Sequence, residues 1–177
     1  MSNKERTYNS QWYTNDKRKE HCLSIAEEGE QLFRSLTGAR QGTFEQDLSH
    51  IDCFWNGKAV DVKGLKPMHK KGFILIEMVN TWGTTGWCAK NSKAQYIAFQ
   101  FPGYFIIVSK TDLRELTILL CPPFNKDEVY RKNFIKPEDG LYKWLGRDNK
   151  QDVFTYVTLE DLQTINHEIL NYATTNP

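Results

Sequence analysis

Two aspartates and a lysine, Asp52, Asp61 and Lys63, follow one another in the pattern D-x8-D-x-K. Between the two acids stand Asn56 and Gly57, which are the strongest short-range signal for a two-residue β-hairpin because both turn positions need positive φ. With that turn, Asp52 lies directly opposite Asp61, and Lys63 emerges on the same face of the hairpin. Opposed like charges destabilise a sheet. We therefore expect a divalent cation between the two carboxylates.

This arrangement favours metal-dependent hydrolysis of phosphodiester bonds. Carboxylate oxygens are the ligands that Mg²⁺ prefers, and we expect Mn²⁺ to substitute for it. A bound metal lowers the pKa of a water molecule and neutralises charge on the phosphate. Lys63 can orient or help to deprotonate that water, and the backbone carbonyl of Val62 is placed to ligate the metal. The same register puts His50 opposite Lys63, where it either contacts the phosphate or hydrogen-bonds locally.

A third acid, Glu77, interrupts the otherwise apolar segment 72–79, which reads as a buried strand because branched residues dominate it. A carboxylate in a buried strand needs a partner. Two positions therefore stay open for Glu77, one at the metal site and one at a strand end that faces solvent.

Lysines cluster around the carboxylate pair, and we expect them to contact the phosphates of DNA, although each could also be an ordinary solvated surface residue. The set comprises Lys58, Lys66, Lys70, Lys71, Lys90 and Lys93.

Composition excludes several classes of protein. The chain of 177 residues has 40% hydrophobic and 25% charged residues, which describes one globular domain. We expect no membrane span and no signal peptide, because no apolar run is long enough. The cysteines at 22, 53, 88 and 121 form no close pairs, so we expect reduced thiols and a cytoplasmic location instead of a zinc site. A net charge of +1 argues against a strongly basic coat protein.

Hydrophobic periodicity and turn residues predict a single α/β (α+β) domain. We expect an irregular arm over 1–16, a core over about 17–120, and a C-terminal extension over 121–177 with one strand and one helix. The predicted helices cover about 17–36, 111–119 and 158–171, and the predicted strands cover 50–55, 58–63, 72–79, 95–101, 104–109 and 153–157.

The motif formed by Asp52, Asp61 and Lys63 resembles that of the PD-(D/E)XK nuclease superfamily. The stretches HIDCFWNGKAVDVKGLK, GFILIEMVN, GTTGWCAK and AQYIAFQF are similar to small nucleases of this type from tailed phages. The similarity covers about residues 20–120, and Ile51 stands where the family usually has proline. The resemblance implies a restriction-endonuclease-like core, in which a central mixed sheet of five or more strands is flanked by helices.

The resemblance also implies a Mg²⁺-dependent DNA endonuclease in phage DNA processing, repair or recombination. Duplex cutters and resolvases commonly work as dimers, so a homodimer is the partner arrangement that it suggests. Family members often place a glutamate from the first helix at the metal. Glu30 is the preferred candidate for this role and Glu27 the second. Two alternatives remain open, a catalytically inactive DNA- or protein-binding module on the same fold and an unrelated α+β interaction protein.

Overall fold

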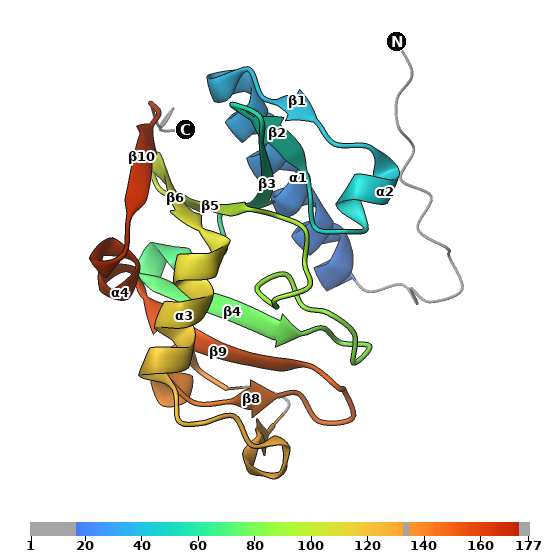
Figure 1. The fold of residues 1–177 in the computed structure, drawn as a ribbon, viewed down its shortest axis with the longest axis vertical. Helices are drawn as coiled ribbons and strands as arrows, with labels where there is room; N and C mark the ends of the chain where they lie inside the picture. Colours follow the sequence, from blue (N-terminus) through green and yellow to red (C-terminus); the bar gives the residue numbers. More distant parts are fainter. Residues whose placement is uncertain (1–16, 133–134, 174–177) are drawn as a thin grey trace.

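The computed structural model describes the backbone of residues 17–132 and 135–173, with side chains from residue 23 onward except that of Lys126. The predicted arm over 1–16 lies outside the described residues. The described chain forms two β-sheets with helices packed on them (Figure 1), which is the predicted α+β class. Among the described residues, no helix is both long and apolar enough to cross a bilayer.

The first sheet has six strands in the order β1-β2-β3-β5-β6-β10. β3 and β5 run parallel, and the other neighbours are antiparallel. The prediction of a mixed sheet with five or more strands is therefore confirmed. The strands are β1 (Arg40–Gln41), β2 (Cys53–Trp55), β3 (Lys58–Lys63), β5 (Tyr96–Phe101), β6 (Tyr104–Ser109) and β10 (His167–Asn171).

The second sheet has four strands in the order β4-β9-β8-β7. They are β4 (Phe73–Val79), β9 (Val153–Thr158), β8 (Leu145–Gly146) and β7 (Tyr130–Arg131). The helices are α1 (Lys17–Thr37), α2 (Phe44–Asp47), α3 (Lys110–Leu120) and α4 (Leu159–Thr164), with short 3₁₀ turns η2 (His69–Lys71), η3 (Lys126–Glu128) and η4 (Pro137–Gly140).

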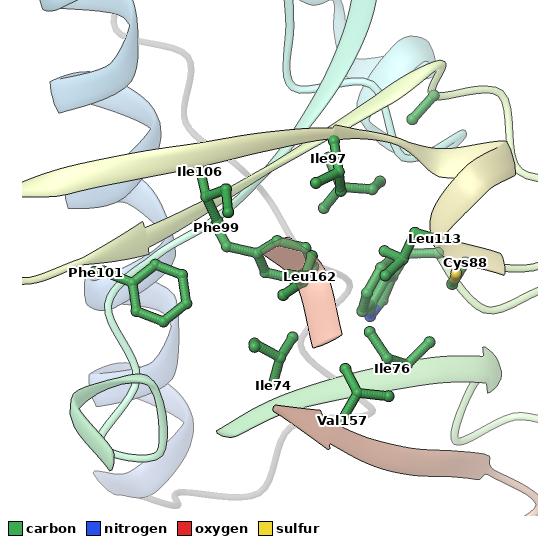
Figure 2. Close-up of a cluster of buried hydrophobic side chains, with 13 residues drawn as sticks. Ile74, Ile76, Cys88, Ile97, Phe99, Phe101, Ile106, Leu113, Val157 and Leu162 are labelled. Carbon is green, nitrogen blue, oxygen red and sulfur yellow. The ribbon is translucent and has the colours of Figure 1, made fainter. Parts of the chain in front are cut away.

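The main hydrophobic core lies between the two sheets. Figure 2 shows Ile97 and Phe99 of the first sheet above Ile74, Ile76 and Val157 of the second. Since side chains alternate along a strand, the residues of β3 that share this face are Ala59, Asp61 and Lys63. Leu113 of α3 and Leu162 of α4 complete the same core.

Helix α1 covers the opposite face of the first sheet, where Phe33 packs with Cys53, Val60 and Val62. Two glycines, Gly29 in α1 and Gly64 directly after β3, allow the helix to come close to the end of the strand. A Cβ atom added to Gly64 would lie 2.2 Å from the carbonyl oxygen of Ile25 in α1. This close contact brings the middle of α1 to the strand that carries Asp61 and Lys63.

Three boundaries differ from the sequence-based predictions. The strand predicted over 50–55 begins only at Cys53, and the helix predicted to about residue 171 ends at Thr164, after which the chain forms β10. A short apolar pattern in an edge strand does not distinguish helix from strand. The segment predicted as a C-terminal extension is also part of the core, because β9 pairs with β4.

Candidate active site

The hairpin has the predicted turn and register. Asn56 and Gly57 have φ values of 49° and 76°. Across the turn, Trp55 pairs with Lys58 and Cys53 with Val60. The turn residues alone therefore set which residues of β2 and β3 face one another.

Asp52 departs from the predicted position directly opposite Asp61, because the ladder ends at Cys53. Its backbone N–H donates to the carbonyl of Val60, and its Oδ2 accepts a hydrogen bond of 2.7 Å from the N–H of Val62. The N–H and C=O of one strand residue point to the same side. The carbonyl of Val62 therefore lies at this same uncovered edge of β3, beside the Asp52 carboxylate.

Asp61 and Lys63 form a buried ion pair. The Lys63 ammonium lies 2.7 Å from Asp61 Oδ1, and the Asp61 side chain is only 3% exposed. Among the described residues, the other carboxylate oxygen, Asp61 Oδ2, is buried without a hydrogen-bond partner. A buried polar atom without a partner is costly, and a bound cation is one way to satisfy a carboxylate oxygen.

Trp87 covers the lysine from the core side. The Lys63 ammonium lies 4.9 Å from the centre of the Trp87 ring, within the range of a cation–π contact. Trp87 is 5% exposed and therefore belongs to the core. No signal in the sequence connected it with Lys63.

Glu30 comes to the same place from α1. It is 5% exposed, and its carboxylate lies 3.6 Å from the guanidinium of Arg34 one turn later. Glu27, the second candidate, is exposed to solvent. Burial therefore separates the two acids in favour of Glu30.

The three carboxylates affect one another. Burial raises the pKa of Asp52 well above its ordinary value, and the charges of Asp61 and Glu30 raise it further, against the attraction of Lys63 and the Val62 N–H. Burial alone lowers the pKa of Lys63, but attraction to Asp61 and Asp52 outweighs it, so that the net shift is upward. The three carboxylates, Glu30, Asp52 and Asp61, outnumber the two cationic side chains beside them, Lys63 and Arg34.

Glu77 is half-buried on β4 of the second sheet. Burial raises its pKa, and the charges of Lys63, Lys66 and His50 act in the opposite direction. Glu77 thus lies near the lysine of the first sheet, within reach of its charge but on a different sheet. Its backbone carbonyl accepts a hydrogen bond from the N–H of Cys88.

His50 is not opposite Lys63, so that prediction is wrong. Its backbone adopts φ of 62°, which breaks the strand before Asp52, and its Nε2 lies 3.4 Å from the carbonyl of Thr85. Positive φ outside glycine is uncommon, and the sequence carried no sign of it here.

The predicted lysine rim is only partly assembled. Lys58 shares a face of β3 with Val60 and covers the ring of Tyr96 at 4.3 Å, which places it away from Asp61. Lys66 lies close enough for its charge to act on Glu77. The remaining lysines, Lys70, Lys71, Lys90 and Lys93, are exposed.

The donor set fits a hard divalent cation. Glu30, Asp52 and Asp61 supply carboxylate oxygens, Val62 supplies a carbonyl, and one oxygen of Asp61 has no hydrogen-bond partner among the described residues. As the side chains stand, no three His, Cys, Asp or Glu residues of the described chain are arranged to hold a metal. Asp61 is instead turned to Lys63 and Asp52 to the Val62 N–H.

No family model, no curated protein and no solved structure matches this chain.

Proposed function

We propose that the protein is a divalent-metal-dependent nuclease that hydrolyses phosphodiester bonds in DNA. The observation that carries this proposal is the joint burial of Glu30, Asp52 and Asp61 beside Lys63, with one oxygen of Asp61 without a hydrogen-bond partner among the described residues. Excess buried negative charge is unfavourable in a structural site. A cation that arrives with the substrate relieves it.

In this proposal Asp52, Asp61, Glu30 and the carbonyl of Val62 hold Mg²⁺ or Mn²⁺. When bound, the metal supplies a water molecule of lowered pKa and neutralises charge on the phosphate. The Lys63 ammonium, fixed by Asp61 and Trp87, donates hydrogen bonds to that water or to a phosphate oxygen. Glu77 acts on the charge of Lys63 from the second sheet.

The fold supports the resemblance to PD-(D/E)XK nucleases. A long first helix packs on a hairpin that bears the two acids and the lysine, and a parallel neighbour, β5, continues the mixed sheet. We take α1 and the first sheet as a restriction-endonuclease-like core. The pairing of β4 with β9 in a separate sheet is the main departure from a core with one central sheet.

The test is cleavage of plasmid DNA and of branched DNA in Mg²⁺ or Mn²⁺ by the wild type, Asp61→Asn and Lys63→Ala. Asp139→Asn serves as the matched control, because this acid is exposed in η4. We expect both site variants to lose at least a hundredfold in rate and the control to keep the wild-type rate. Equal cleavage by the wild type and both site variants overturns the proposal.

A second measurement tests the metal without catalysis. Mn²⁺ should raise the melting temperature of the wild type, and Asp52→Asn should lose most of that increase. Stabilisation by Mn²⁺ without cleavage of either DNA would identify an inactive binding module on the same fold. Failure of both measurements would leave the acids as a structural cluster and refute the nuclease assignment.

A further inference from the structure

A hollow of about 280 Å³ opens between segments 48–50, 80–85 and 91–93. Its walls are joined to one another. The N–H of Lys93 donates to the carbonyl of Ser49, and the ring of His50 lies 3.4 Å from the carbonyl of Thr85. The hollow is therefore formed before any ligand arrives. Its volume lies just below the usual range of ligand pockets, so the ligand can be no larger than about one nucleotide.

The hollow is linked to the proposed active site through His50. His50, in its wall, stands two residues before Asp52 in the chain. The charge of His50 also acts on Glu77, and that of Glu77 acts on Lys63. A group bound in the hollow would thus be a close neighbour of a phosphate held at the carboxylates.

The lining differs in charge from the carboxylate cluster. None of the described residues that line the hollow is acidic, and the one lysine among them, Lys93, is exposed. The Lys93 ammonium is therefore accessible to a phosphate group of a ligand. The Thr84 hydroxyl accepts a hydrogen bond of 2.7 Å from the side chain of Asn80, which leaves its proton to donate to a ligand. Asn91 adds an exposed amide with both a donor and an acceptor.

One wall is apolar and open to solvent. Leu48 lines the hollow and is 67% exposed, so that its side chain is available for contact with a ligand. A flat apolar ligand face placed against Leu48 would remove both surfaces from water. A nucleotide has three parts that these features match. The apolar wall suits the face of its base, the hydrogen-bonding side chains suit the edge of the base, and the lysine suits its phosphate.

We propose that the hollow binds one unpaired nucleotide of the substrate strand, next to the bond that is cut. A base enters a hollow of this size only after it has left the duplex stack, and proteins read unpaired bases by their faces and edges. The substrate class is then DNA with a single-stranded nucleotide at the cleavage point, such as a branch or a flap. This inference rests on the proposed nuclease function.

Binding without metal tests the inference separately from catalysis. Fluorescence anisotropy in EDTA would compare a labelled short single strand with a blunt duplex of the same sequence. We expect at least tenfold tighter binding of the single strand by the wild type. Lys93→Ala should reduce the slope of log affinity against log salt concentration by about 0.7, the value for one phosphate contact in a single strand. Lys136→Ala, at an exposed lysine outside the hollow, should leave the slope unchanged.

A second variant tests the apolar wall. Leu48→Ser should weaken binding of the ordinary strand severalfold and leave binding of a strand of abasic residues unchanged, because only the base contacts Leu48. Equal affinity for duplex and single strand overturns the inference, as do equal effects of Lys93→Ala and Lys136→Ala. Plasmid cleavage with either of these failures refutes the nucleotide site and leaves the nuclease proposal intact. If the binding results are as expected but neither DNA is cleaved, the nuclease proposal is refuted and the nucleotide-binding site remains supported.

Discussion

The Lys63 ammonium lies 2.7 Å from Asp61 Oδ1, and only 17% of the lysine side chain is exposed. Together with Arg34 beside Glu30, Lys63 supplies the positive charge that the site carries in its own sequence. The ion pair leaves the second oxygen of Asp61 unsatisfied by any described residue, and it leaves Asp52 with a raised pKa. The lysine and a metal would therefore share one task, the compensation of buried negative charge.

Replacement of Lys63 should destabilise the metal-free protein. Lys63→Met keeps the length of the side chain and removes its charge, so that Asp61 loses its partner at a cost of about 3–5 kcal/mol. Urea unfolding in EDTA would measure this loss, and Mg²⁺ should restore part of it because the cation replaces the missing charge. Lys136→Met is the control at an exposed lysine. An unchanged free energy of unfolding for Lys63→Met would show that the ion pair is unimportant.

The ring of Trp87 should matter for the rate as well as for packing. Trp87→Phe keeps an aromatic face over Lys63, whereas Trp87→Leu keeps only the apolar contact. A cation–π contact of about 1–2 kcal/mol corresponds to a rate about tenfold lower for the leucine variant at saturating DNA. The melting temperatures of both variants would show whether the proteins are folded. Equal rates for the two variants would leave Trp87 with a role in packing alone.

Gly64→Ala should disrupt the site from a distance. The added Cβ would lie 2.2 Å from the Ile25 carbonyl oxygen, so that α1 has to move and carry Glu30 with it. We expect a loss of about 1–3 kcal/mol in unfolding free energy, together with weaker Mn²⁺ stabilisation. Gly38→Asn is the control, because Gly38 has positive φ, which asparagine tolerates, and an added Cβ would have open space. Normal Mn²⁺ stabilisation in Gly64→Ala would separate α1 from the metal site.

His69 should make stability depend on pH. It is 3% exposed, and burial lowers its pKa from 6.5 to about 4, against a hydrogen bond that its Nδ1 donates to the carbonyl of Gln100. Between these two pKa values the unfolded chain binds a proton that the folded protein does not, so stability falls as the pH falls. The loss between about pH 7 and pH 5 is of order 2 kcal/mol.

His69→Gln should remove this contribution to the pH dependence, even if it lowers stability at every pH. Urea unfolding across this pH range would measure it, with His167→Gln on β10 as the control. A variant with the same pH dependence as the wild type would exclude His69 as its source.

Local signals predicted the parts of this fold that depend on neighbouring residues. The Asn56-Gly57 turn predicted the register of β2 and β3, and the strands predicted over 95–101 and 104–109 correspond to β5 and β6. The apolar run of β4 correctly indicated a buried strand, but it carried no information about its partner. Pairing with β9 depends on contacts between distant segments, which local patterns do not encode.

In the candidate site, too, local patterns predicted some features, whereas others depend on contacts between distant segments. Alternation along β3 placed Asp61 and Lys63 on one face, and inward helical spacing favoured Glu30 over Glu27. The position of Asp52 at the Val62 N–H depends on the positive φ of His50 two residues earlier, which no sequence pattern indicated. The Trp87 contact with Lys63 depends on how the loop after β4 folds back over the sheet.

The pairing of Glu77 with Phe154 has a consequence for synthesis of the protein. During translation, β4 leaves the ribosome long before β9. The backbone edge and the apolar inner face of β4 therefore stay unpaired until β9 has been synthesised. The hairpin and α1 can form early, but the second sheet cannot support the lysine side of the site until residues 153–158 are available. The candidate active site of the nascent chain thus stays incomplete for most of its elongation.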